Sequence, residues 1–197
     1  MAMAQLGNGL HEAGRHEEEL SVREAELSML RRIGNSEHNM LVAQGNLAST
    51  YKALGRLEPV LPISRDVFLG FLKLHGEEHE TTLLAANNYA STLSSLERYG
   101  EASKLLRKLT PVARRALGEN NELTLTVRWL YARALYEDDG ATLDDLRESV
   151  ETLGSVAPLW TRVFGLSHPD TPNVQRALKN ARKALAARAA ASSSGAA

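Results

Sequence analysis

The chain has 197 residues, a formal net charge of −1 and no cysteine, and 43% of its residues are hydrophobic. The composition is that of an ordinary folded protein, and the balanced charge argues against a dedicated nucleic-acid binder, which needs surplus Lys and Arg to neutralise phosphates. The lack of cysteine excludes disulfides and thiolate chemistry and fits a reducing compartment. Because no apolar run is long enough to span a bilayer, we expect an intracellular, cytoplasmic protein without membrane insertion.

The sequence repeats itself with a period of about 42 residues. One marker is a glycine that recurs 42 residues apart and then, for the fourth copy, 47 residues later, at Gly34, Gly76, Gly118 and Gly165. A second marker is the segment 46–51, Asn-Leu-Ala-Ser-Thr-Tyr, which returns at 88–93 as Asn-Tyr-Ala-Ser-Thr-Leu. Independent markers that keep one period indicate internal repeats.

Each repeat is predicted to contain two amphipathic helices. In chain order, the repeats are expected at about 2–37, 38–79, 80–121 and 122–168, followed by a cap helix at 171–190 and a flexible tail at 191–197. Apolar residues at helical spacing form the predicted buried stripes. These stripes are Val22, Ala25, Met29 and Ile33 in the first repeat, Leu47, Tyr51 and Leu54 in the second, Tyr89, Leu93 and Leu96 in the third, and Leu143, Leu146, Val150 and Leu153 in the fourth. The glycine markers are expected at helix C-termini, where a left-handed backbone is cheapest for glycine.

The pattern predicts an all-α protein. A pair of helices cannot bury its apolar face alone, whereas stacked pairs share a continuous core, as in an α-solenoid. We therefore expect about four helix pairs and a C-terminal capping helix in a single domain over residues 1–190.

Several motifs resemble the tetratricopeptide repeats of the kinesin-light-chain type. They are the loop 165–171 (Gly-Leu-Ser-His-Pro-Asp-Thr), the first-helix signature Asn46-Leu47-Ala48 with Tyr51, and the turn 98–102 (Arg-Tyr-Gly-Glu-Ala). The resemblance covers roughly residues 5–185. It implies a right-handed α-solenoid that binds proteins or peptides and is not an enzyme.

The resemblance also places the first helix of each repeat along a concave groove. The side chains that it puts there as candidates for peptide or protein binding are Asn46, Ser49, Asn87, Asn88, Ser91, Trp129, Arg133 and Tyr136. Asn46 and Asn88 would hold a peptide backbone, since an amide both donates and accepts hydrogen bonds. Trp129 and Tyr136 would be aromatic anchors, and Arg133 would pair with an acid of the partner. The alternative interpretation is that Trp129 packs between repeats and that the serines face water.

No catalytic site, metal site or cofactor is predicted. His75 and His79 flank two glutamates, but the zinc-protease motif H-E-x-x-H needs the glutamate next to the first histidine, and Gly76 marks a helix end. His11 and His16 are expected to flank a turn. Paired acids at helix starts suit the helix dipole and solvent.

The predicted function is a non-catalytic adaptor or scaffold that binds another protein or an extended peptide segment in the groove. The alternative is a permanent structural subunit that bridges neighbours inside a large assembly. The basic C-terminal helix is a candidate contact for an acidic partner, through Arg176, Lys179, Arg182, Lys183 and Arg188. Nucleic acid is not expected there, because the helix has no aromatic residue for base stacking.

Overall fold

The computed structural model describes residues 2–194, and over that range the chain forms only α-helices and the turns that connect them. The chain folds as two compact units, residues 1–96 and 97–197. The predicted all-α class is confirmed. The boundary between the two units falls inside the predicted repeat 80–121. The single domain predicted over residues 1–190 and the predicted repeat bounds stay predictions.

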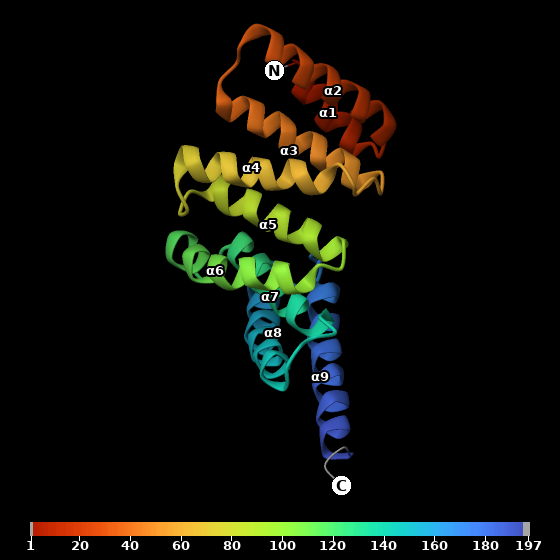
Figure 1. Cartoon of the computed structure of the whole chain (residues 1–197), viewed down its shortest axis with the longest axis vertical. Helices are drawn as coiled ribbons and strands as arrows, with labels where there is room; N and C mark the ends of the chain where they lie inside the picture. The colour runs from red at the N-terminus through yellow and green to blue at the C-terminus, as the bar shows by residue number, and fades with distance from the viewer. Residues whose placement is uncertain (1, 195–197) are drawn as a thin grey trace. The chain divides into compact units, whose positions relative to one another are not determined.

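The first unit contains five helices within its described residues (Figure 1). They are α1 (Ala2–Glu12), α2 (His16–Ile33), α3 (Glu37–Ala53), α4 (Val60–His75) and α5 (Glu80–Ser95). Each helix packs against the helix that precedes it in the sequence, which is the arrangement expected of stacked helix pairs.

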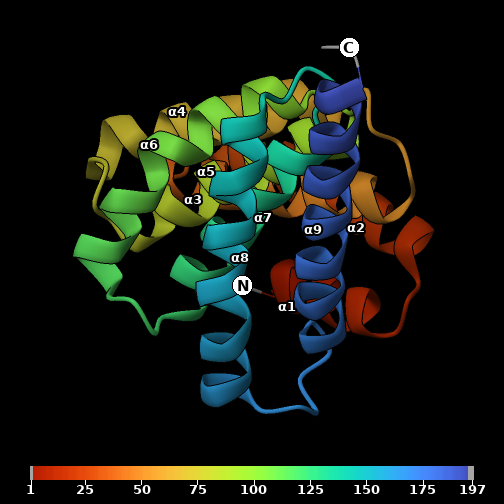
Figure 2. The same cartoon turned by 90° about the horizontal axis from the view of Figure 1, so that it is seen from below.

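The second unit contains four helices within its described residues. They are α6 (Tyr99–Leu117), α7 (Glu122–Glu137), α8 (Leu143–Phe164) and α9 (Thr171–Ser194). Consecutive helices pack together, and α9 also contacts α7. Figure 2 shows α8 and α9 side by side and running in opposite directions. Helix α9 continues beyond the predicted cap helix 171–190, and residues 195–197 of the predicted flexible tail lie outside the described residues.

Glycine ends four of the helices, as the repeat predicted. Gly34, Gly76, Gly118 and Gly165 follow α2, α4, α6 and α8 with φ angles of 69°, 81°, 88° and 82°. In this region of φ a side chain on Cα clashes with the backbone, so glycine is the residue of lowest cost. Each of these glycine N–H groups donates to a carbonyl in the last turn of its helix.

The 42-residue period extends to individual hydrogen bonds. Thr82, near the start of α5, donates its hydroxyl to the carbonyl of Phe71 at 3.1 Å, and Thr124, near the start of α7, donates to that of Ala113 at 3.2 Å. Both hydroxyls are buried. Each bond joins a first helix to the end of the helix before it, so the repeat fixes the local packing as well as the helix positions.

The core of the first unit confirms the stripes predicted for the second and third repeats only in part. Leu47 and Leu93 are buried, whereas Tyr51, Leu54, Tyr89 and Leu96 are half-buried. A central cluster from α3, α4 and α5 consists of Leu41, Val67, Phe71 and Ala85.

The stripe predicted for the first repeat is not the most buried face of α2, because its residues Val22 and Met29 are only half-buried. Ala25 and Ile33 are exposed, and α2 instead buries Leu20 and Leu27 together with the charged residues Glu19, Arg23 and Glu26. Because three interior positions carry charged side chains, the spacing of apolar residues alone identifies the wrong face of this helix.

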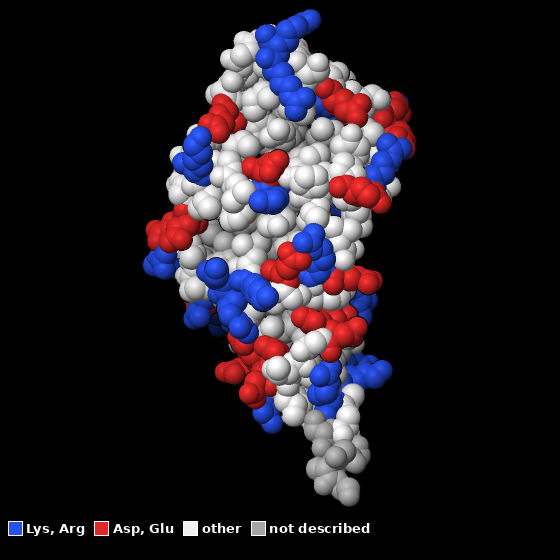
Figure 3. Space-filling view, viewed as in Figure 1, with Lys and Arg blue, Asp and Glu red and all other residues white. Residues whose placement is uncertain are grey.

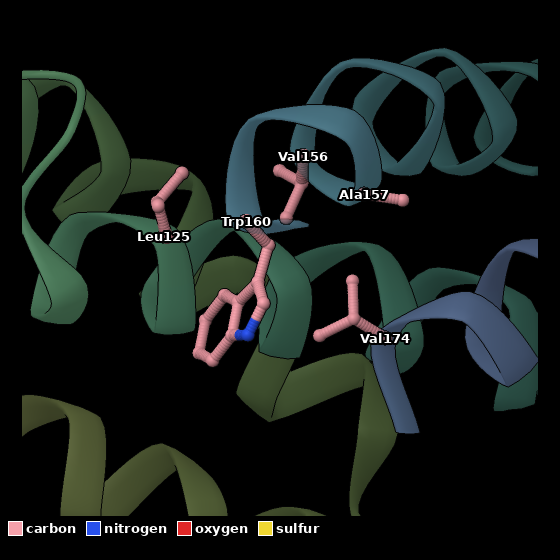
Figure 4. Close-up of a cluster of buried hydrophobic side chains, with 5 residues drawn as sticks. All are labelled: Leu125, Val156, Ala157, Trp160 and Val174. Carbon is pink, nitrogen blue, oxygen red and sulfur yellow. The ribbon is translucent and has the colours of Figure 1, made fainter. Parts of the chain in front are cut away.

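The core of the second unit is built around Trp160. Figure 4 shows its ring in a cluster with Leu125 of α7, Val156 and Ala157 of α8, and Val174 of α9. Trp160 is 1% exposed, so this one large side chain joins three helices. Leu146 and Leu153 of the predicted fourth-repeat stripe are buried, and Leu143 and Val150 are half-buried.

Within the described residues, none of the helices combines the length and the apolar character that crossing a membrane requires.

Candidate functional site

One cavity of the first unit lies between α3 and α5. It has a volume of about 270 Å³. Its lining comes from α3 (Leu41, Val42, Gly45, Asn46, Ala48, Ser49, Lys52), from α4 (Val60, Ser64, Val67, Phe71) and from α5 (Thr81, Leu84, Ala85, Asn88, Thr92). The first helices of two successive repeats therefore form its walls, and a second helix lies between them in the sequence.

The cavity has an apolar floor and an apolar rim. Leu41, Val67 and Phe71 of the floor belong to the buried cluster of the unit. Val42 and Leu84, which are 42 residues apart, keep 40% and 48% of their surface exposed. Exposed apolar side chains next to a cavity mark a surface suited to contact with another molecule.

Polar side chains stand along the same cavity. Asn46 is half-buried, while Ser49 and Asn88 are exposed. The Nζ of Lys52 donates to the Ser91 Oγ at 2.7 Å, which connects α3 with α5. The structure thus brings together four of the predicted site residues, Asn46, Ser49, Asn88 and Ser91.

Asn87 lies elsewhere. It is only 8% exposed, and its buried Oδ1 has no hydrogen-bond partner among the described residues. Its position in the interior differs from the groove position expected from the sequence, because on α5 the side chain next to Asn88 turns toward the core.

The other three predicted residues line a separate cavity in the second unit. This cavity also measures about 270 Å³ and is formed by Trp129, Arg133, Tyr136 and Glu137 of α7 and by Asn173, Arg176, Ala177 and Asn180 of α9. The Nε of Arg133 lies 3.9 Å from a carboxylate oxygen of Glu137. Burial, with the nearby Glu137 charge, raises the pKa of the Tyr136 hydroxyl above its ordinary value, against the opposing effect of Arg133.

The contribution of α9 to this cavity was missed by the sequence reasoning. The fourth repeat is 47 residues long, and the residue 47 positions after Leu130 of α7 is Ala177 of α9. Helix α9 therefore occupies the position of a further first helix. In that register Asn173, Arg176 and Asn180 fall on groove positions. The spacing of the last two glycine markers contained this signal.

Trp129 supports the alternative interpretation as well. Its ring packs edge-on against Trp160, with centroids 6.1 Å apart, and its buried Nε1 has no hydrogen-bond partner among the described residues. Trp129 is thus part of the packing between helices and also lines the cavity.

Five of the six histidines occupy two clusters in the first unit. His79 caps α5 by accepting a hydrogen bond from the backbone N–H of Thr81. Its ring stacks on the ring of His75. The Nε2 of His75 in turn lies 3.0 Å from the Nδ1 of His38. In the second cluster, His11 and His16 both approach Glu19, so their predicted role as residues that flank a turn is incomplete.

The basic side chains of α9 are not equivalent. Arg188 donates to the backbone carbonyls of Ala141 and Asp139, at 2.7 and 3.1 Å, and so holds the loop between α7 and α8. Arg176 lines the cavity with α7. On the face seen in Figure 3, acidic and basic side chains are interspersed. The acidic partner at this helix stays a prediction.

Comparison with known proteins agrees with this architecture. Residues 82–122 match the family model described as a tetratricopeptide repeat. A search of curated protein sequences gives no match.

Among solved structures, the nearly identical TPR-like repeats of a kinesin light chain candidate from Podosopora anserina are similar over 98% of this chain and 89% of theirs, with a TM-score of 0.76 and 22% identity. A variant of the same repeats gives a TM-score of 0.78 at the same identity and coverage. BtubC (BKLC) from P. vanneervenii is similar over 92% of this chain and 71% of its own, with a TM-score of 0.75 and 14% identity.

Residues 82–122 therefore match a tetratricopeptide repeat, and the chain has the fold of the kinesin-light-chain-like repeat structures. The resemblance drawn from the motifs is confirmed. Proteins of this class generally act as non-catalytic modules for protein–protein interaction.

Proposed function

We propose that the chain is a non-catalytic adaptor or scaffold that binds an extended segment of a partner protein in the cavity between α3 and α5. One observation carries the proposal: two successive first helices present the same kinds of side chain, 42 residues apart, to one apolar cavity. Val42 and Leu84 form one such pair, and Asn46 and Asn88 form the other.

The two amides suit the backbone of an extended chain. Such a chain exposes N–H and C=O groups that have no internal hydrogen-bond partner, and each asparagine side chain offers both a donor and an acceptor. Because Asn46 and Asn88 lie on different helices, they would contact different residues of the guest. This arrangement favours a segment over a compact small molecule.

The cavity also indicates the side chains of the guest. A volume of about 270 Å³ is small next to the roughly 300–1,000 Å³ of cavities that bury a drug-sized ligand, and it suits one or two apolar side chains. Lys52 contributes a positive charge to the lining. The proposed guest is a segment with an apolar residue at the cavity and an acidic residue nearby.

The cavity of the second unit supports a separate, more polar contact. Arg133 and Arg176 line it together with Glu137 and two asparagines of α9. We propose that Arg133 pairs there with an acidic group of the partner, as the sequence suggested. Surface charge pairs are screened by salt, so added salt should weaken this contact more than the contact in the first unit.

The test is a titration of a captured partner segment against matched variants of the full chain. Leu84→Asp places a charge at the apolar rim, and Leu69→Asp is its control, because Leu69 on α4 is 44% exposed and does not line the cavity. Leu84→Asp should abolish binding, whereas Leu69→Asp should bind as the wild type does. Asn46→Ala and Asn88→Ala should each weaken binding about 2- to 12-fold, the loss expected for one neutral hydrogen bond.

A third variant tests the alternative of a permanent structural subunit. Lys179→Gln together with Lys183→Gln neutralises exposed charges of α9. If this variant loses the partner while Leu84→Asp binds like the wild type, the cavity is not the binding site. The bridging subunit then becomes the better description.

A further inference from the structure

Two imidazole rings contact a buried carboxylate in the first unit. Glu19 of α2 is 1% exposed. Its Oε2 lies 2.9 Å from Nδ1 of His11 and 3.3 Å from Nδ1 of His16. The three atoms that would serve as ligands all lie within 4.8 Å of one another. His11 lies in the last turn of α1 and His16 is the first residue of α2, so the turn between these helices positions both rings.

The second oxygen of the same carboxylate is held by other side chains. Glu19 Oε1 accepts a hydrogen bond from the hydroxyl of Thr50 at 2.9 Å and a longer one from Nε of Arg23 at 3.4 Å. These contacts fix the orientation of the carboxylate and leave Oε2 to the imidazoles. Outer contacts of this kind orient the ligands of metal sites.

The buried charges around Glu19 do not balance. Glu19 and Glu26 are both buried, and the buried cation beside them is Arg23, which lies 3.4 Å from each carboxylate. A guanidinium and two carboxylates leave one negative charge among these buried groups, and the remaining contacts of Glu19 Oε2 are the two imidazoles. A cation at the side of Glu19 that faces the imidazoles would compensate it.

We propose that His11, His16 and Glu19 bind a divalent transition-metal ion of the Zn²⁺ type through two imidazole nitrogens and one carboxylate oxygen. Zn–N and Zn–O bonds of about 2.0–2.2 Å at tetrahedral angles set neighbouring ligand atoms about 3.3–3.6 Å apart. The two Nδ1–Oε2 distances of 2.9 and 3.3 Å need only a small outward shift of the rings, and the two imidazole nitrogens lie within 4.8 Å of each other. Nitrogen and oxygen ligands without thiolate are a set that Zn²⁺ accepts.

The fourth ligand position would face an open cavity. A space of about 210 Å³ is lined by two of the three residues, His11 and Glu19, and further by Asn8, Glu12, Arg23, Asn46 and Ser49. Water or the carboxylate of Glu12 could complete a tetrahedral site there. Asn46 and Ser49 also line the cavity between α3 and α5, so the ion would lie at the end of the proposed binding groove without being required for it.

The test is titration of Zn²⁺ alone into the full chain at about pH 7.5, because metal affinity depends on pH. The protein is free of any polyhistidine tag and is treated with a chelator beforehand. Calorimetry should show one site per chain. His11→Gln and His16→Gln should each weaken Zn²⁺ binding at least about 10-fold, because each removes a ligand, and Thr50→Val should weaken it about 10-fold by freeing the carboxylate. Substitution by Co²⁺ should give the visible absorption of a tetrahedral ion with nitrogen and oxygen ligands.

The second histidine cluster supplies the matched control. His38 and His75 also bring two ring nitrogens within 3.0 Å, and among the described residues no buried carboxylate is hydrogen-bonded to either ring. His38→Gln should leave Zn²⁺ binding unchanged. Binding that persists in His11→Gln and His16→Gln but is lost in His38→Gln would overturn the assignment. An absence of Zn²⁺ binding at micromolar concentration would also overturn it and leave the cluster as a hydrogen-bonded network.

Discussion

The interior around α2 contains charged side chains, whereas the interior around α8 is mainly apolar, although the two helices have equivalent positions in the repeat. Each helix is the second of a pair and packs against a helix before it and one after it. In α2 the interior positions include Glu19, Arg23 and Glu26, whereas α8 fills its interior with Leu153, Val156 and Trp160. The repeat architecture therefore dictates where side chains are buried but does not dictate that they are apolar.

The difference has an energetic consequence. Apolar burial stabilises in proportion to the area removed from water. A buried ionic cluster gains little net free energy, because the desolvation of the charges offsets their attraction, but it becomes strongly destabilising when one partner is removed. We expect the two regions to respond differently to substitution.

The largest effect is expected for Trp160→Ala. Removing this ring should lower the free energy of unfolding by about 3–5 kcal/mol, since it leaves a cavity among three helices. Urea denaturation monitored by circular dichroism measures the loss. Val163→Ala is the control, because Val163 lies on the same helix and is 39% exposed; its cost should stay below about 0.5 kcal/mol. Equal losses would contradict the description of Trp160 as the centre of this core.

The next effect concerns the ionic cluster. Arg23→Leu leaves Glu19 and Glu26 without their buried cation and should cost about 3 kcal/mol, at the lower end for a broken buried pair because a carboxyl can take up a proton instead. The combined variant Glu19→Leu, Arg23→Leu and Glu26→Leu should be close to the wild type in stability, since a hydrophobic replacement of a whole ionic cluster is often neutral or stabilising. If the triple variant were less stable than Arg23→Leu, the attraction among the charges of the cluster would exceed the free energy lost by their desolvation.

A pH-dependent effect is expected in the second unit, at Tyr131. Its hydroxyl accepts a hydrogen bond from Nε of Arg107 and donates one to a carboxylate oxygen of Glu148, both at 2.7 Å. Burial and the Glu148 contact raise the pKa of Tyr131 from 10.0 to about 12. The protonated form is favoured in the folded state, so its contribution, up to about 2–3 kcal/mol, is complete below about pH 10 and lost as the pH rises toward about 12.

The measurement is the urea midpoint of the wild type and of Tyr131→Phe between about pH 9 and pH 12, the range that spans both pKa values. The wild type should lose more stability over this range than the variant, which has no hydroxyl to ionise. Parallel curves for the two proteins would show that Tyr131 ionises equally in the folded and unfolded states.

The smallest effect compares the turns within helix pairs. Glu97 has a φ of 59°, in the region where Gly14 and Gly55 lie at the equivalent turns, with φ of 68° and 71°. A side chain in this conformation is strained by about 1 kcal/mol, so Glu97→Gly should raise the free energy of unfolding by up to that amount. Glu97→Ala keeps a Cβ at the same φ and should give no such gain. A stabilisation by alanine as large as that by glycine would point to the loss of charge as the cause.

Much of the fold could be predicted from the sequence because its signals are local and periodic. The 42-residue spacing of Gly34, Gly76 and Gly118 located the helix C-termini, since positive φ favours glycine whatever the surroundings. The matching segments at 46–51 and 88–93 likewise located first helices and brought Asn46 and Asn88 to one cavity. Residues that share a position in neighbouring repeats tend to share a surface, so this part of the candidate site followed from the repeat itself.

What only the tertiary structure decided depends on contacts between residues far apart in the sequence. Hydrophobic spacing identified the wrong face of α2, because Arg23 is interior. Carboxylates on the same helix make this position possible, as does Asn8 of α1. The Nη2 of Arg23 donates a hydrogen bond to the Oδ1 of Asn8 at 2.6 Å. The meeting of His11 and His16 at Glu19 has the same origin. A charged or polar side chain can be interior when its partners arrive from other helices, and a one-dimensional pattern of apolar residues contains no record of those partners.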